Sequence, residues 1–242
     1  ILASLLLLCA GIVQFAFNLW SSHTLQMPRK AHWMHRGLYD NKTIYENTLA
    51  AFDSALHKNI EGIEFDLFYI DSLNDFVISH DLPNRFGLPP LHLSTVLKRY
   101  DTSFSYWLDL KNLNEINKQA IVHQLNKLLV GTLKSKVYIE SGNASPLGYL
   151  ANQGFRTIYW VQYNRTNWLK KYLKKKLIQG YCLKYPFAGV SIAASMADED
   201  FFDSFGNIPS FIFHIYTPEQ YHQIKNHSNI SVYLMDHIPA IE

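Results

Sequence analysis

Three acidic residues lie within apolar segments of the 242-residue chain, at positions where β-strands are expected. Glu64 and Asp66 are two residues apart in GIEFDLF, and Asp109 follows in WLDLK. Because side chains alternate across a strand, Glu64 and Asp66 share one face if Phe65 points to the other. Carboxylates on one buried face repel each other, and a divalent cation removes that cost. We therefore expect Glu64, Asp66 and Asp109 to bind one Mg²⁺ or Ca²⁺ ion.

Basic side chains and histidines accompany these acids. Lys111 lies two positions after Asp109 and on the same strand face, where a bound cation would repel it unless an anion lay between them. A phosphate group would contact both. His35 ends the first expected strand, and His80 follows the apolar run 76–79, which we expect to return as a hairpin. Both histidines are candidates for proton transfer, because imidazole titrates near neutral pH.

The chain from residue 30 onward alternates short runs of strand-forming residues with helical patterns. The expected strands are Ala31–His35, Gly62–Phe68, Tyr106–Leu110, Val137–Glu140, Thr157–Val161, Gly189–Ala193, Phe211–Ile215 and Ser231–Met235. A strand followed each time by a helix predicts a (β/α)8 TIM barrel, with a doubly wound open sheet as the alternative. In such a barrel the C-terminal strand ends meet at one mouth, where the acids and histidines would come together.

Four motifs in one register resemble the glycerophosphodiester phosphodiesterase family, a branch of the phospholipase C-like phosphodiesterase barrels. They are His35-Arg36-Gly37, Glu46-Asn47-Thr48, Glu64-Phe65-Asp66 and His80-Asp81. The similarity is strongest over residues 31–81 and continues to the last two expected strands. It implies a metal-dependent phosphoric diester hydrolase that cleaves glycerophosphodiesters or lysophospholipid-type lipids.

The resemblance also implies a role for each matching residue. His35 and His80 match the general acid/base pair, and Arg36 and Lys111 match groups that contact the substrate phosphate. Glu64 and Asp66 match two metal ligands, and Asp109 occupies the third ligand position, where this family usually has glutamate.

Two departures from the family leave other functions open. Asp109-Leu110-Lys111 is similar to the sphingomyelinase D enzymes, which favours a phospholipid lyase. The inserted subdomain that usually follows the His-Asp motif is absent, which leaves the expected mouth less covered. A catalytically silent barrel that binds a lipid headgroup or a protein is the third alternative, although none of the expected catalytic residues is missing. Trp160, Tyr163, His214 and Tyr216 lie near expected strand ends and are candidates to line a headgroup pocket.

Composition and charge exclude several other classes. Lys and Arg number 22 against 20 Asp and Glu, a net charge of +2 without a long basic tract outside one helix, so we expect no nucleic-acid partner. Two cysteines cannot form a disulfide framework or a cysteine-based zinc site. The oligomeric state is left open.

The first twenty residues are apolar and carry no charged side chain. Twenty helical residues span about 30 Å, the hydrocarbon thickness of a bilayer. The segment is therefore either a cleaved signal peptide or a retained anchor, and its length favours the anchor. We expect a single-pass anchor or signal-anchor over residues 1–22, followed by one barrel domain over residues 29–242. An extracytoplasmic barrel is favoured, with the side of the membrane left open.

Overall fold

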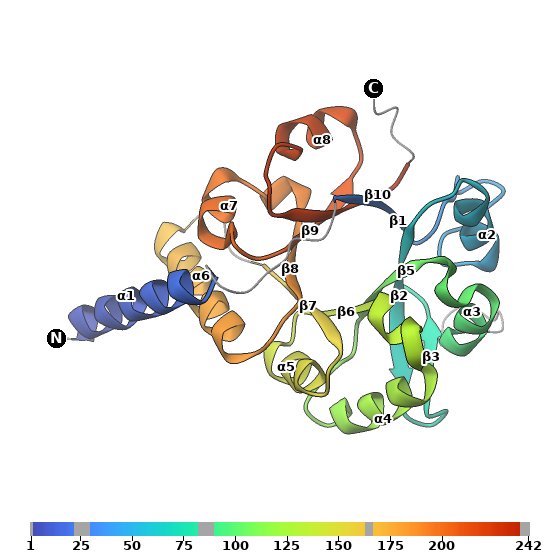
Figure 1. Cartoon of the computed structure of the whole chain (residues 1–242), viewed down its shortest axis with the longest axis horizontal. Helices are drawn as coiled ribbons and strands as arrows, with labels where there is room; N and C mark the ends of the chain where they lie inside the picture. The colour runs from blue at the N-terminus through green and yellow to red at the C-terminus, as the bar shows by residue number, and fades with distance from the viewer. Residues whose placement is uncertain (1, 22–29, 82–89, 163–166, 238–242) are drawn as a thin grey trace.

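The computed structural model describes residues 2–21, 30–81, 90–162 and 167–237. Its central feature is a ring of strands with helices outside it (Figure 1). Eight parallel strands form the ring: β1 (Ala31–His35), β2 (Gly62–Ile70), β5 (Ser105–Leu110), β6 (Val137–Ser141), β7 (Arg156–Trp160), β8 (Gly189–Ala193), β9 (Ser210–Ile215) and β10 (Ile230–Met235). The first strand β1 pairs with both β2 and β10, which closes the barrel. The predicted TIM barrel is confirmed, and the open-sheet alternative is wrong.

Two shorter strands extend the barrel at β2. The strand β3 (Asp75–Ile78) returns antiparallel to β2, as the hairpin prediction requires, and β4 (Leu91–His92) pairs with β3. The hairpin carries the chain back toward the barrel mouth, so that His80 emerges beside the site formed by β2.

Seven helices follow strands around the barrel: α2 (Leu49–His57), α3 (Leu93–Tyr100), α4 (Lys118–Leu128), α5 (Ala144–Asn152), α6 (Trp168–Lys184), α7 (Glu199–Phe205) and α8 (Pro218–Ile224). Side-chain caps set several of their N-termini. Thr48 accepts a hydrogen bond from the backbone of Ala51 at the start of α2. Thr217 and Gln220 form a capping box at α8, with Pro218 in the first turn. These caps satisfy backbone donors that a helix start leaves unpaired.

Strand alternation separates an inner layer from an outer layer of side chains. Trp33, Trp107 and Phe211 contact one another inside the barrel. Phe65 points outward and its ring lies 5.3 Å from that of Phe52 on α2. The outward direction of Phe65 confirms that its neighbours Glu64 and Asp66 face the barrel interior, as the spacing predicts.

Helix α1 (Leu2–Ser21) corresponds to the predicted anchor over residues 1–22. Ile1 and Ser22 lie outside the described residues. It runs beside α6 (Figure 1). The side chain of Phe17 is buried against Phe205 of α7, with ring centroids 6.2 Å apart, and Gln14 accepts a hydrogen bond from Lys176. Within the described part of the chain, no helix has both the length and the apolar character needed to cross a membrane.

A matched pair of glycine substitutions tests the packing inside the barrel. A Cβ atom at Gly62 would lie 2.5 Å from the indole of Trp33, whereas one at Gly180 in α6 meets nothing within 4 Å. We expect Gly62→Ala to lower the free energy of unfolding by about 1–3 kcal/mol through overpacking. Gly180→Ala should raise it by about 0.5–1 kcal/mol through helix propensity. Denaturant unfolding of both variants measures the difference, and equal stabilities would contradict the packing described for Trp33.

Candidate active site

One cavity of about 190 Å³ opens at the C-terminal ends of the strands. The seven residues that the sequence singled out for chemistry all line it, and they come from β1, β2, β5 and the hairpin: His35, Arg36, Glu64, Asp66, His80, Asp109 and Lys111. Trp107, Glu140, Trp160, Phe213, His214 and Leu234 complete the wall. Because a water molecule occupies about 30 Å³ of liquid, the cavity has room for a phosphate group and a hydrated cation.

The three predicted ligands form a compact carboxylate cluster. Glu64, Asp66 and Asp109 each offer an oxygen, and these oxygens lie within 4.8 Å of one another. Burial, followed by the charges of the other two acids, raises the pKa of Glu64 well above its ordinary 4.5. Burial also raises the pKa of Asp109, although Lys111 opposes that shift. Three carboxylates this close cannot all ionise without added positive charge.

Asp66 is 1% exposed and lies between two basic side chains. Lys111 Nζ lies 2.6 Å from one carboxylate oxygen and Arg36 Nε lies 2.8 Å from the other. Burial alone would raise the pKa of Asp66, but these two cations outweigh burial and lower it. Lys111 also contacts Asp109, and its own pKa is raised because the two acids overcome the effect of burial. Asp66 is therefore the acid most firmly held as an anion.

The donor set fits a hard divalent cation. Glu64, Asp66 and Asp109 supply only oxygen atoms, which Mg²⁺ and Ca²⁺ prefer. Counted as ionised, the three acids exceed Arg36 and Lys111 by one negative charge. Burial, and next the charges of Asp66 and Asp109, raise the pKa of Glu64, and a bound cation would offset both effects.

The turn after β1 explains the His-Arg-Gly motif. Arg36 and Gly37 both have positive φ angles, of 56° and 83°. A Cβ atom at Gly37 would lie 2.8 Å from Phe52, so glycine meets both the conformation and the close approach of α2. The turn aims the Arg36 backbone N–H at Glu64, at 3.1 Å, and its guanidinium at Asp66.

The Glu-Asn-Thr motif braces the same turn from the other side. Glu46 accepts a hydrogen bond from Arg36 Nη1 at 2.7 Å. Asn47 donates from its side chain to Asp66 at 2.9 Å and from its backbone to the Arg36 carbonyl at 3.0 Å. Thr48 then caps α2. The motif therefore orients a cation and a carboxylate and starts a helix within three residues.

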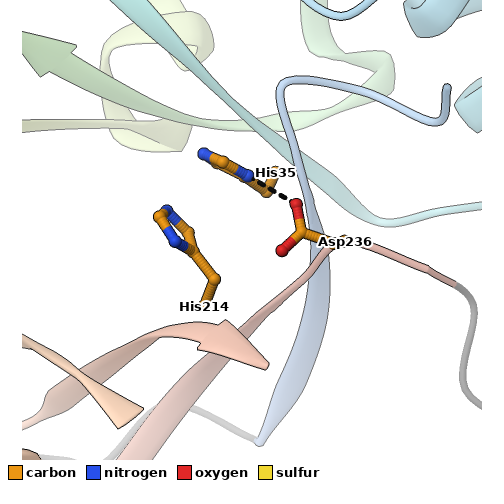
Figure 2. Close-up of side chains that lie close together, drawn as sticks. All are labelled: His35, His214 and Asp236. Carbon is orange, nitrogen blue, oxygen red and sulfur yellow. Dashed lines mark hydrogen bonds and ion pairs between the residues drawn. The ribbon is translucent and has the colours of Figure 1, made fainter. Parts of the chain in front are cut away.

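His35 is held by a carboxylate that the sequence analysis did not identify. Its Nδ1 lies 2.7 Å from Oδ1 of Asp236, which follows β10 (Figure 2). The Tyr39 hydroxyl donates to the same oxygen at 2.9 Å. With Nδ1–H donated to Asp236, the lone pair of Nε2 is free; Nε2 lies 3.8 Å from Glu64. A carboxylate that selects one imidazole tautomer prepares the other nitrogen for proton transfer.

His80 is held far less firmly than His35. Its side chain is 49% exposed, and its Nδ1 lies 3.4 Å from Asp81. The side chain lines the cavity from the hairpin, away from β1. The structure thus brings both histidines to the cavity, one buried and braced and the other on the solvent side.

Glu140 is a fourth acid in the cavity that sequence reasoning missed. It lies on β6 in register with Asp109, accepts a hydrogen bond from the Trp107 indole at 3.0 Å and another from Ser191. Burial, and next the charge of Asp109, raises its pKa to about 8. The signal was available, because Glu140 ends an apolar strand just as Asp109 does.

Of the four residues expected to line a headgroup pocket, Trp160 and His214 line the cavity, whereas Tyr216 is exposed and does not. Tyr163 lies outside the described residues. The pairing of β9 with β10 has a register shift beside His214. An extra residue in a strand turns two consecutive side chains to one face, so Phe213 and His214 both reach the cavity. Strict alternation would have placed one of them outside.

Comparisons with known proteins were made at the level of sequence and of structure. No protein-family model matches the chain, and a search of curated proteins finds no match. A glycerophosphodiester phosphodiesterase from Parabacteroides distasonis is 15% identical with a TM-score of 0.64, over 87% of this chain and 94% of that one. A phosphodiesterase from Oleispira antarctica, solved with its product sn-glycerol-3-phosphate, is 17% identical with a TM-score of 0.63, over 87% and 94%.

A more distant similarity extends to phospholipase C. A calcium-dependent phosphoinositol-specific phospholipase C from Pseudomonas sp. is 12% identical with a TM-score of 0.52, over 86% of this chain and 88% of that one. At these identities the similarity establishes the fold. The resemblance predicted from the motifs is confirmed at the level of the fold, which this chain shares with solved glycerophosphodiester phosphodiesterases.

Proposed function

We propose that the chain is a metal-dependent phosphodiesterase that hydrolyses a glycerophosphodiester or a lysophospholipid-type substrate. One observation carries the proposal: a single cavity joins a buried cluster of three carboxylates, two cationic side chains and the His35–Asp236 pair. Each group meets a separate need of phosphodiester cleavage, which requires charge neutralisation and two proton transfers. The shared fold with phosphodiesterases supports the same conclusion.

The chain's own residues supply phosphate binding and proton transfer. Lys111 has three N–H donors and directs two of them to Asp66 and Asp109, which leaves one for a phosphate oxygen. Arg36 contributes a second positive charge at the same edge of the cavity. His35, oriented by Asp236, exchanges a proton on one side of the phosphate, and His80 does so from the solvent side.

Glu64, Asp66 and Asp109 would hold the divalent cation, Mg²⁺ or Ca²⁺. When bound, this ion supplies Lewis-acid stabilisation of negative charge on the phosphate. The lowered pKa of Asp66 favours the ionised form that binds the cation, whereas the raised pKa of Glu64 makes cation binding compete with protons.

A second cavity, of about 260 Å³, supports a substrate with a polar headgroup. It shares Asp109, Lys111 and Trp160 with the first cavity, and Asn143 and Gln162 add hydrogen-bonding side chains. A substrate whose phosphate lies at Lys111 can therefore extend into this cavity.

Attachment to a membrane through residues 1–22 and an extracytoplasmic barrel remain predictions from the sequence.

A substrate panel tests the function directly. The 242-residue chain is incubated with glycerophosphocholine, lysophosphatidylcholine or an aryl phosphodiester, in Mg²⁺, Ca²⁺ or EDTA. We expect cation-dependent release of a linear phosphomonoester, which phosphorus NMR detects. A cyclic phosphate as the final product would instead indicate the sphingomyelinase D-like lyase that Asp109-Leu110-Lys111 favours. Binding without turnover would indicate the silent barrel.

Substitution of the buried proton-transfer pair should separate chemistry from stability. We expect His35→Ala to lower kcat by about 10²- to 10⁴-fold, the usual contribution of a general acid or base. Asp236→Asn should lower it by about 10- to 100-fold, because the imidazole keeps its place but loses its oriented tautomer. The exposed His57 at the end of α2 provides the control His57→Ala. Wild-type kcat in His35→Ala with an unchanged circular dichroism spectrum would contradict the mechanism.

The raised pKa of Glu64 predicts a pH dependence of cation binding. Because the metal-free protein keeps a proton on Glu64 above pH 4.5, Mg²⁺ must displace it, and the affinity should rise with pH by up to about tenfold per unit. Calorimetric titrations at several pH values measure this slope. Glu64→Gln should weaken binding and reduce the slope, whereas Glu219→Gln on the exposed face of α8 should change neither.

The raised pKa of Glu64 also predicts that the stability of the metal-free protein changes with pH, in the opposite direction to the cation affinity. The folded protein binds more protons than the unfolded chain above pH 4.5, so its stability should fall as pH rises through the raised pKa of Glu64. Thermal unfolding in EDTA should show a smaller fall for Glu64→Gln. An equally steep fall in this variant would contradict the assignment.

A further inference from the structure

A second group of possible metal ligands lies beside the carboxylate cluster. His35 ends β1, His214 lies on β9 and Asp236 follows β10, and Figure 2 shows the three side chains facing one another. Each offers one ligand atom, and these three atoms lie within 4.8 Å of one another. The group contains two imidazoles and one carboxylate, a donor set different in kind from the oxygen-only cluster.

Asp236 provides independent evidence for a missing positive partner. Its residue is 4% exposed, and its Oδ1 accepts hydrogen bonds from both His35 and Tyr39. Its Oδ2 is buried and has no hydrogen-bond partner among the described residues. Figure 2 shows this second oxygen turned toward His214. A buried carboxylate oxygen without a partner is costly, and a cation beside it removes the cost.

The two histidines are close neighbours, and each has one ring nitrogen beside an oxygen atom of another side chain. Their ring centroids lie 3.8 Å apart with planes tilted by 32°. His214 Nδ1 lies 3.0 Å from the Tyr216 hydroxyl, and His35 Nδ1 lies 2.7 Å from Asp236. An oxygen such as that of Tyr216 commonly fixes the ring orientation of a ligating histidine, whereas Asp236 is itself one of the three possible ligands.

We propose that His35, His214 and Asp236 form a second metal site, selective for a borderline transition-metal ion such as Zn²⁺. Two nitrogen donors and one oxygen donor favour Zn²⁺ or Co²⁺, whereas the oxygen-only cluster favours Mg²⁺ or Ca²⁺. The two sites adjoin, since His35 Nε2 lies 3.8 Å from Glu64. They differ in ligand chemistry and can be filled by different ions.

Occupation of the second site has a consequence that rests on the proposed function. A metal ion bound to either nitrogen of His35 takes the lone pair or replaces the proton that proton transfer requires. The ion would also engage Asp236, which orients that ring. Zn²⁺ is therefore an inhibitor that acts at His35 while Mg²⁺ occupies the carboxylates.

Cobalt absorption tests the site without reference to activity. The 242-residue chain is saturated with Mg²⁺ and titrated with Co²⁺, whose visible absorption strengthens when nitrogen ligands reduce its coordination number. We expect one equivalent of Co²⁺ to produce this spectrum. His214→Ala should weaken its binding by about 10- to 100-fold or more, since losing a ligand costs at least as much as losing an outer-sphere partner. The exposed His57 again provides the matched control, His57→Ala, which should bind as the wild type does.

Two further variants separate the sites. Asp109→Asn, which disrupts the carboxylate cluster, should keep the cobalt spectrum, whereas Asp236→Asn should lose it. A spectrum that disappears in Asp109→Asn and persists in His214→Ala would overturn the proposal, as would the absence of any nitrogen-ligated cobalt. In a separate measurement, Zn²⁺ should inhibit Mg²⁺-dependent turnover. A protein that binds cobalt as expected but turns over no phosphodiester would contradict the proposed function and leave the metal site standing.

Discussion

The balance of charge around Asp66 is the constraint on which the candidate site depends. This carboxylate is almost fully buried, and its two oxygens face Lys111 at 2.6 Å and Arg36 at 2.8 Å. Removing either cation would leave this buried carboxylate with only one positively charged partner, and breaking a buried ion pair is destabilising. The positive φ of Arg36 and the bracing by Asn47 both serve this contact. The two motifs recognised in the sequence are thus parts of one electrostatic arrangement.

Barrel closure brings this arrangement next to the proposed proton-transfer pair, His35 and Asp236. His35 and Asp236 are 201 residues apart in the chain, yet His35 Nδ1 lies 2.7 Å from Asp236 Oδ1 because β1 pairs with β10. The same strand pairing completes the hydrogen bonding of the barrel and leaves no open edge between its first and last strands. Stability and chemistry therefore share one structural element, since loss of the β1–β10 pairing would open the barrel and separate the pair.

His35 stands between two environments of different chemistry. On one side lie Glu64 and the other two carboxylates of the cluster. On the other lie the His214 imidazole and the Asp236 oxygen that has no hydrogen-bond partner among the described residues. A hard cation among the oxygens leaves the imidazole free to carry protons. A borderline cation among the nitrogens engages the imidazole itself. In the proposed two-site arrangement, the identity of the bound metal would therefore decide whether His35 is free to carry a proton.

The sequence by itself determined the barrel, the inward direction of Glu64 and Asp66, and the place of Asp109 at a strand end. These features follow from local rules, namely strand alternation and the order of strands and helices. Only the tertiary structure decided that Asp236 orients His35 and that Phe213 and His214, although consecutive, both reach the cavity. The first depends on pairing between the chain's distant strands, and the second on a register shift between β9 and β10. Neither is visible locally, because a contact across 201 residues and an extra residue in a strand both arise only when the sheet closes.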